Sequence, residues 1–174
     1  MEYIITDEIE SIVAATKNAL GLSVLNYQYG YVEELNETLA QWEKDPAKYQ
    51  VKFPLVWLAE PFDTNASGSN DYDQAELTLF IMNSTTAEYK AKDRMEVNFK
   101  PVIYPIYEEL LNQICLSNAF TEMDPAKVQH RRTNRYYFGE NKQSVLNDKV
   151  DCMKIGQLKL SISPKPTCTP FSNF

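Results

Sequence analysis

The closest things to paired catalytic carboxylates are Asp71 with Asp73 and Asp148 with Asp151, and the second pair lies where an alternating apolar strand is predicted to begin. A two-metal nuclease holds its cations with such acids at strand ends and uses a nearby lysine, here Lys149. Aspartates in this setting also accept backbone hydrogen bonds in turns and at strand edges, which is the simpler interpretation. Metal-dependent cleavage of a phosphodiester therefore stays open as one alternative.

The sequence lacks the residues that other kinds of catalytic site require. His130 is the only histidine, which excludes metal sites built from two histidines of one chain, and no Gly-x-Ser-x-Gly elbow is present. The five glycines form neither a phosphate-cradling loop nor a dinucleotide fingerprint, and the acidic stretch 70–76 is too short for a calcium loop. We therefore expect no enzymatic activity and no cofactor, and we interpret His130 as a polar residue beside a strand.

Cations and aromatic rings gather between residues 131 and 138. The cluster consists of Arg131, Arg132, Arg135 and the run Tyr136-Tyr137-Phe138. Rings beside cations suit single-stranded nucleic acid, and the same residue types are typical of protein-binding surfaces. The formal charge of −7, from 24 acidic and 17 basic residues, argues against nucleic acid as the main partner, because phosphates must be neutralised by lysine and arginine.

The composition is that of a globular chain. Its 174 residues are 44% hydrophobic, which suits one domain with a core of its own. Three cysteines match no zinc spacing, and their odd number argues against a closed disulfide framework. The N-terminus has no signal-peptide pattern, and no apolar stretch reaches the roughly 18 residues of a membrane span. We expect one domain over residues 1–163, a proline-rich tail over 164–174, synthesis in a cytoplasm and no membrane partner.

Hydrophobic periodicity predicts the elements that must position these residues. Helices are predicted over 5–20, 32–44 and 87–116, and strands over 24–29, 53–59, 75–82, 130–138 and 152–162. Asp7 and Glu10 should cap the first helix. Pro101 and Pro105 should kink or break the third helix, and Gly156 should mark a bulge in the last strand. Because no βαβ rhythm recurs, an α+β fold is predicted, with a mainly antiparallel sheet and helices packed on one face.

The run 53–59 is the most apolar of the chain. It is predicted to be a strand buried on both faces that pairs with 75–82 as a long-looped hairpin. Trp57 and Leu79 are both expected in the main core, where replacement by alanine should cost on the order of 3–5 kcal/mol.

The order of these features resembles the tail terminator family of tailed bacteriophages, which includes the minor tail protein that caps lambda-like tail tubes. The features are a first helix, the strand Phe53-Pro54-Leu55-Val56-Trp57-Leu58, a polar loop, the strand 75–81, a helix with a Tyr104-Pro105 step, the Arg- and Tyr-rich strand 131–137 and a closing strand 155–162. The chain departs from the lambda-like pattern by an extra strand and helix at 24–46 and by the tail after 163.

The resemblance implies a structural virion protein that forms a ring, commonly of six copies, at the head-proximal end of the tail. Such a ring stops the tail tube, joins it to the neck proteins and lets DNA pass through its lumen without specific binding. Another head–tail connector or a tail-completion protein is the runner-up. Residues on strand edges and long loops are then candidates for the subunit interface. They are Asp63, Asn70, Asp71, Tyr72, Asp73, Arg131, Arg132, Arg135, Tyr137, Asn147 and Asp148.

Overall fold

The structure is a computed structural model that describes residues 4–65, 73–138 and 146–163. Its helices are α1 (Ile5–Ala19), α2 (Val32–Lys44), α3 (Pro46–Tyr49), α4 (Ala91–Arg94), a π-helical segment (Met95–Ile103) and α5 (Tyr104–Leu116), with a 3-10 turn at Pro125–Lys127. Its strands are β1 (Asn26–Gly30), β2 (Leu55–Ala59), β3 (Asp63–Asn65), β4 (Gln74–Ser84), β5 (Gln129–Phe138) and β6 (Val150–Ser161). The predicted order of helices and strands is thus confirmed, with β3 and two short helices added. The expected tail 164–174 lies outside the described residues.

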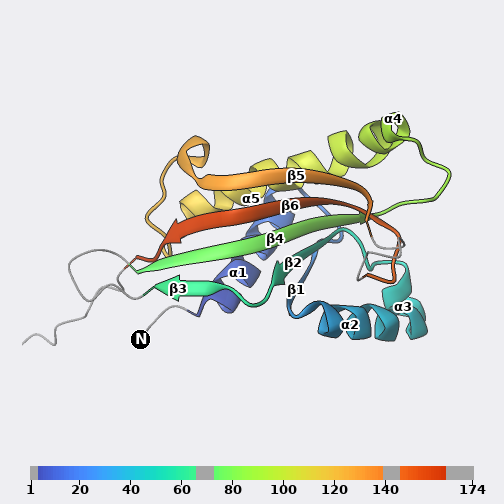
Figure 1. The fold of residues 1–174 in the computed structure, drawn as a ribbon, viewed down its shortest axis with the longest axis horizontal. Helices are drawn as coiled ribbons and strands as arrows, with labels where there is room; N and C mark the ends of the chain where they lie inside the picture. Colours follow the sequence, from blue (N-terminus) through green and yellow to red (C-terminus); the bar gives the residue numbers. More distant parts are fainter. Residues whose placement is uncertain (1–3, 66–72, 139–145, 164–174) are drawn as a thin grey trace, which may run out of the picture.

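The strands form one sheet in the order β1-β2-β4-β6-β5, and β3 pairs with β4 beyond the end of β2 (Figure 1). All pairs are antiparallel except β1 with β2, which is parallel. The predicted pairing of strands 53–59 and 75–82 is confirmed by the register of β2 with β4. The α+β class with a mainly antiparallel sheet is therefore confirmed.

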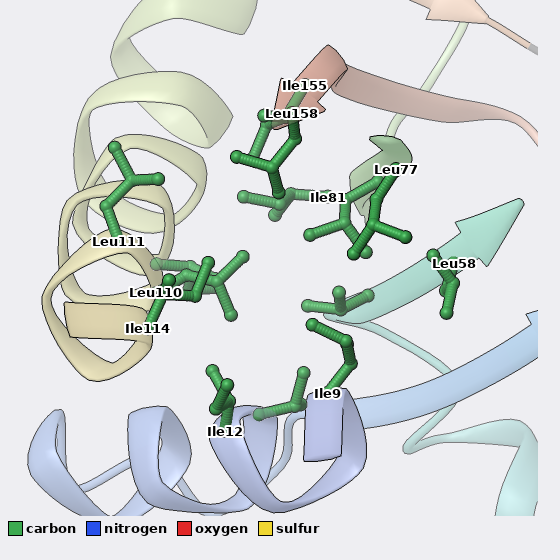
Figure 2. Close-up of a cluster of buried hydrophobic side chains, with 14 of the residues drawn as sticks. Ile9, Ile12, Leu58, Leu77, Ile81, Leu110, Leu111, Ile114, Ile155 and Leu158 are labelled. Atoms are coloured by element: carbon green, nitrogen blue, oxygen red, sulfur yellow. The ribbon is translucent and has the colours of Figure 1, made fainter. Parts of the chain in front are cut away.

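The main core lies between the sheet and two helices, α1 and α5. Figure 2 shows Ile9 and Ile12 of α1 and Leu110 and Ile114 of α5 pointing toward sheet residues such as Leu77. The side chains of β4 alternate, so that Leu77, Leu79 and Ile81 enter this core while Phe80 and Met82 point to the opposite face. Leu79 is therefore in the main core as expected.

A second, smaller core lies on the other face of the sheet, beneath α2. Leu35 and Leu39 of α2 pack there with Leu55 and Trp57 of β2. The expectation that Trp57 shares the main core is wrong, because successive side chains of a strand point to opposite faces. The expectation that helices cover only one face is incomplete for the same reason: β2 is apolar on both sides, and α2 covers its second side.

The proline-containing helix stays helical through both of its prolines. Pro101 lies within the π-helical segment, and Pro105 is the second residue of α5, which continues directly from that segment. The expected interruption takes the form of a change from α to π geometry and back, at Arg94 and Ile103.

Two local predictions, a cap for the first helix and a bulge in the last strand, had different outcomes. The predicted cap is wrong: α1 begins at Ile5, ahead of Asp7 and Glu10, and no side chain caps it. The predicted bulge is confirmed, because Leu77 and Leu79 of β4 face Leu158 and Ile155 of β6, which leaves one residue of β6 in excess. Gln157 takes a positive φ of 54° there.

Candidate functional site

Part of the second sheet face lies beyond α2, and it carries a group of cations. Figure 1 shows α1 and α5 behind the sheet, and among the described residues no helix lies in front of strands β4, β6 and β5. Arg131 and Arg135 of β5 and Lys154 of β6 line a hollow of about 410 Å³ on this side. Polar residues complete its lining, namely Glu76, Thr78, Thr133, Gly156 and Gln157. We call Arg131, Arg135 and Lys154 the basic face.

The strand register fixes how the three cations are arranged. Lys154 lies directly across from Thr133, midway between Arg131 and Arg135 on the edge strand. Its ammonium also lies 5.8 Å from the centre of the Phe80 ring, at the border of the second core. The sequence pattern predicts the two arginines as surface residues but does not indicate Lys154. Its place between Met153 and Ile155, which both enter the main core, was the signal that it faces the other way.

The third predicted arginine, Arg132, lies on the opposite side of β5, toward α5. Its guanidinium carbon is 5.5 Å from the centre of the Tyr104 ring and 5.2 Å from that of Tyr107. Asn134, two residues further on, donates to the hydroxyl of Tyr104 at 2.8 Å. The alternation of a strand therefore separates Arg132 from the basic face and gives it contacts within the chain.

His130 also faces α5, and its two ring nitrogens have different partners. Nδ1 lies 2.8 Å from the carbonyl of Val128, which can only accept, so Nδ1 carries the proton. Nε2 then accepts from the Tyr107 hydroxyl at 2.7 Å when the ring is neutral. The histidine thus fastens the start of β5 to α5; it lies within this strand and not beside it.

Two predicted interface residues instead hold α2 against the sheet. The carboxylate of Asp148 accepts from the buried Lys52 ammonium at 2.8 Å, and Glu43 of α2 accepts from the same ammonium at 3.2 Å. The backbone N–H of Asn147 donates to the side-chain oxygen of Asn36 at 3.1 Å. The segment before β6 is thereby tied to α2 by an ion pair and a hydrogen bond.

The acidic pair proposed for metal binding is divided between two environments. Asp151 is fully buried and accepts from Arg94 at 2.9 Å and from Asn98 at 2.6 Å. Asp148 forms an ion pair with Lys52, as described above. Over residues 4–65, 73–138 and 146–163, no group of three or more His, Cys, Asp or Glu side chains is placed to hold a metal ion.

The remaining predicted interface residues lie at the far end of the sheet or beyond the described part. Asp63 is exposed on β3, opposite Glu76 of β4, and the carbonyl of Asp73 accepts from the N–H of Ile162. Asn70, Asp71 and Tyr72 are outside the described residues, and Tyr137 is described only as part of the backbone of β5. Among the candidates whose side chains are described, the structure groups Arg131 with Arg135 and places the others elsewhere.

Among the helices of the described residues, none is long and apolar enough to cross a membrane. No protein-family model matches the sequence, and no curated protein is similar enough to count as a relative.

Proposed function

We propose that this chain is a structural protein of a phage virion that assembles as a ring at the head-proximal end of a tail, where it stops the tail tube and joins it to the neck. The observation that carries the proposal is the sheet itself. Strands and helices follow each other in the order that suggested the tail terminator family, and in the described part of the chain β5 is an edge strand of the sheet they form.

The edge strand β5 supports assembly through this sheet. It is 10 residues long and pairs only with β6 within the described part of the chain, so one side of its backbone has donors and acceptors to offer. Arginines along the strand protect such an edge from indiscriminate pairing while still allowing a specific partner. A subunit of a ring needs two different surfaces that meet head to tail, and the basic face next to β5 is suited to be one of them.

The proposal is tested by the mass and shape of the purified protein. Mass photometry and negative-stain microscopy should show a closed ring of several copies, commonly six for the family it resembles. When co-expressed with a phage tail-tube protein, the ring should be found at one end of the tubes. A chain that remains monomeric at every concentration and leaves tube ends uncapped would overturn the proposal. Cross-links to a portal-side protein instead would identify a head–tail connector.

A further inference from the structure

We propose that the basic face of one copy binds the outer side of helix α2 of a second copy, through Glu33 and Glu37. This inference rests on the proposed ring, since it names the contact between neighbouring subunits. It is carried by the charges and spacings of the two surfaces.

The basic face offers cations at a regular spacing. Lys154 is the diagonal cross-strand neighbour of both Arg131 and Arg135, so adjacent cations are roughly 7–8 Å apart at their backbone positions. Both arginines are exposed, and Lys154 is half-buried at the edge of the second core. Cations this far apart do not converge on one carboxylate or one phosphate. They suit a partner that carries several negative charges in a row.

Helix α2 carries such a row on its solvent side. The helix has four glutamates and one lysine. Glu34 is used by the N–H of Tyr31, and Glu43 by Lys52. Glu33 and Glu37 are exposed and make no ion pair in the described part of the chain. They are one helical turn apart, which places their side chains about 5–6 Å from each other at the Cβ atoms. The two carboxylates can therefore each meet one cation of the basic face.

A second copy explains the charges better than a nucleic acid does. The chain as a whole is acidic, with a net charge of −7, so a phosphate polymer lying along the basic face would be repelled by the rest of the surface. A second copy is equally acidic, but only the short stretch of α2 with Glu33 and Glu37 has to lie against the basic face. Because every copy carries both surfaces, and the two differ, the contact is head to tail and can repeat until the ring closes.

Charge reversal with rescue tests the contact. Variant one carries Arg131→Glu and Arg135→Glu, and variant two carries Glu33→Lys and Glu37→Lys. Each variant alone should fail to assemble in mass photometry, because its two surfaces then carry the same sign of charge. An equal mixture of the two variants should assemble again, since each then finds a complementary neighbour. A chain with all four substitutions should assemble as well.

Matched controls separate the contact from a general effect of net charge. Lys92→Glu with Lys100→Glu changes the charge by the same amount as variant one, and Glu88→Lys with Glu108→Lys by the same amount as variant two. All four residues are exposed, and none belongs to α2 or to the basic face. Both controls should assemble like the wild-type chain, and circular dichroism of every variant should show an unchanged fold.

A second readout uses the wild-type chain only. A carbodiimide joins a lysine amine to a nearby carboxylate with loss of water. In a mixture of ¹⁴N- and ¹⁵N-labelled protein, mass spectrometry should find Lys154 linked to Glu33 or Glu37 between differently labelled chains.

The inference is overturned if rings form but the charge-reversed variants assemble like wild type, or if the mixture of the two variants does not assemble. Wild-type protein that never assembles would overturn the proposed ring itself. Variant one losing affinity for a DNA duplex, without rescue by variant two, would assign the face to nucleic acid.

Discussion

Asp151 is a fully buried carboxylate whose partners come from helix α4 and the π-helical segment. One oxygen accepts from Arg94 and the other from Asn98, and Asn98 in turn accepts from Asn83 at 2.9 Å. Arg94 also donates to Thr85 and to the carbonyl of Thr86. This network fastens the helical connection to the ends of β4 and β6, so its disruption should be felt as a loss of stability.

Replacing Asp151 with asparagine should destabilise the fold by about 3–5 kcal/mol, because it removes the buried carboxylate that is ion-paired with the buried Arg94. Urea unfolding at neutral pH measures this difference. Glu96→Gln is the matched control, since it breaks an exposed pair with Lys100 and should cost less than about 0.5 kcal/mol. A cost below about 1 kcal/mol for Asp151→Asn would show that water reaches Arg94.

Cys152 should make the fold sensitive to alkaline pH. Burial raises the pKa of its thiol from the ordinary 9.0 to about 12, so the folded chain keeps the proton while the unfolded chain loses it. A raised pKa means stability that is fully present below pH 9 and is lost as the pH rises toward 12. From pH 9 to 10 the unfolding free energy should fall by about 1 kcal/mol on this account.

Urea unfolding of the wild-type chain and of Cys152→Ala at both pH values isolates that contribution. The alanine variant is less stable throughout, but its decline from pH 9 to 10 should be smaller by about 1 kcal/mol. Burial also raises the pKa of Tyr27, which acts at higher pH and is common to both proteins. Equal declines in the two proteins would mean that Cys152 ionises as readily folded as unfolded.

At the scale of elements, α2 is fastened to the sheet by a small core and one buried lysine. Leu39→Ala should destabilise the fold by about 2–4 kcal/mol, because Leu39 is fully buried against that core. Hydrogen exchange should accelerate over Val32–Lys44 and remain slow over α5, which belongs to the main core. Leu116→Ala, at an exposed leucine, should change neither quantity. Uniform acceleration over both helices would mean that the two cores open together.

Most elements could be predicted from the sequence because the apolar residues of each helix recur every 3–4 positions and those of most strands every second position. The helix Val32–Lys44 has the predicted bounds, and the bulge at Gly156 is where a glycine interrupts the alternation of β6. The parallel pairing of β1 could not be predicted, since it depends on which edge of β2 is left open. The second core was missed because β2 is apolar throughout, and a pattern with no alternation says nothing about which helix covers which side.

The candidate site was predicted less completely than the fold. Arg131, Arg132 and Arg135 form one cluster in the sequence, but the alternation of β5 places only the first and last on the bare face. Lys154 joins them from a strand 19 or more positions further on, through the register of β5 with β6. The partners of Asp151 are likewise distant, with Arg94 57 residues away. Contacts of this kind depend on tertiary pairing, which local patterns do not contain.

At the scale of the whole molecule, the charges are divided between surfaces. A chain with a net charge of −7 repels its own copies at long range, yet its basic face gathers three cations on one half-face of the sheet. Assembly through that face therefore depends on short-range attraction that exceeds a general repulsion. Salt screens both the long-range repulsion between subunits and the short-range attraction at the basic face. The repulsion between distant charges is screened at lower salt concentrations than the attraction between close ones.

The proposed ring should accordingly respond to salt in a characteristic way. At about 0.1 M salt the screening length is ~10 Å, which damps repulsion between whole subunits while leaving contacts at the basic face in place. At 1 M it is ~3 Å, and exposed pairs such as those of Arg131 with a glutamate lose most of their attraction. Mass photometry across this range should show the ring population falling as salt increases from 0.1 to 1 M. The mixture of the two charge-reversed variants should follow a similar curve, because half of its contacts keep the wild-type charges and half carry them with exchanged signs. Rings that grow more stable toward 1 M salt would point to an apolar interface, since high salt does not weaken apolar burial.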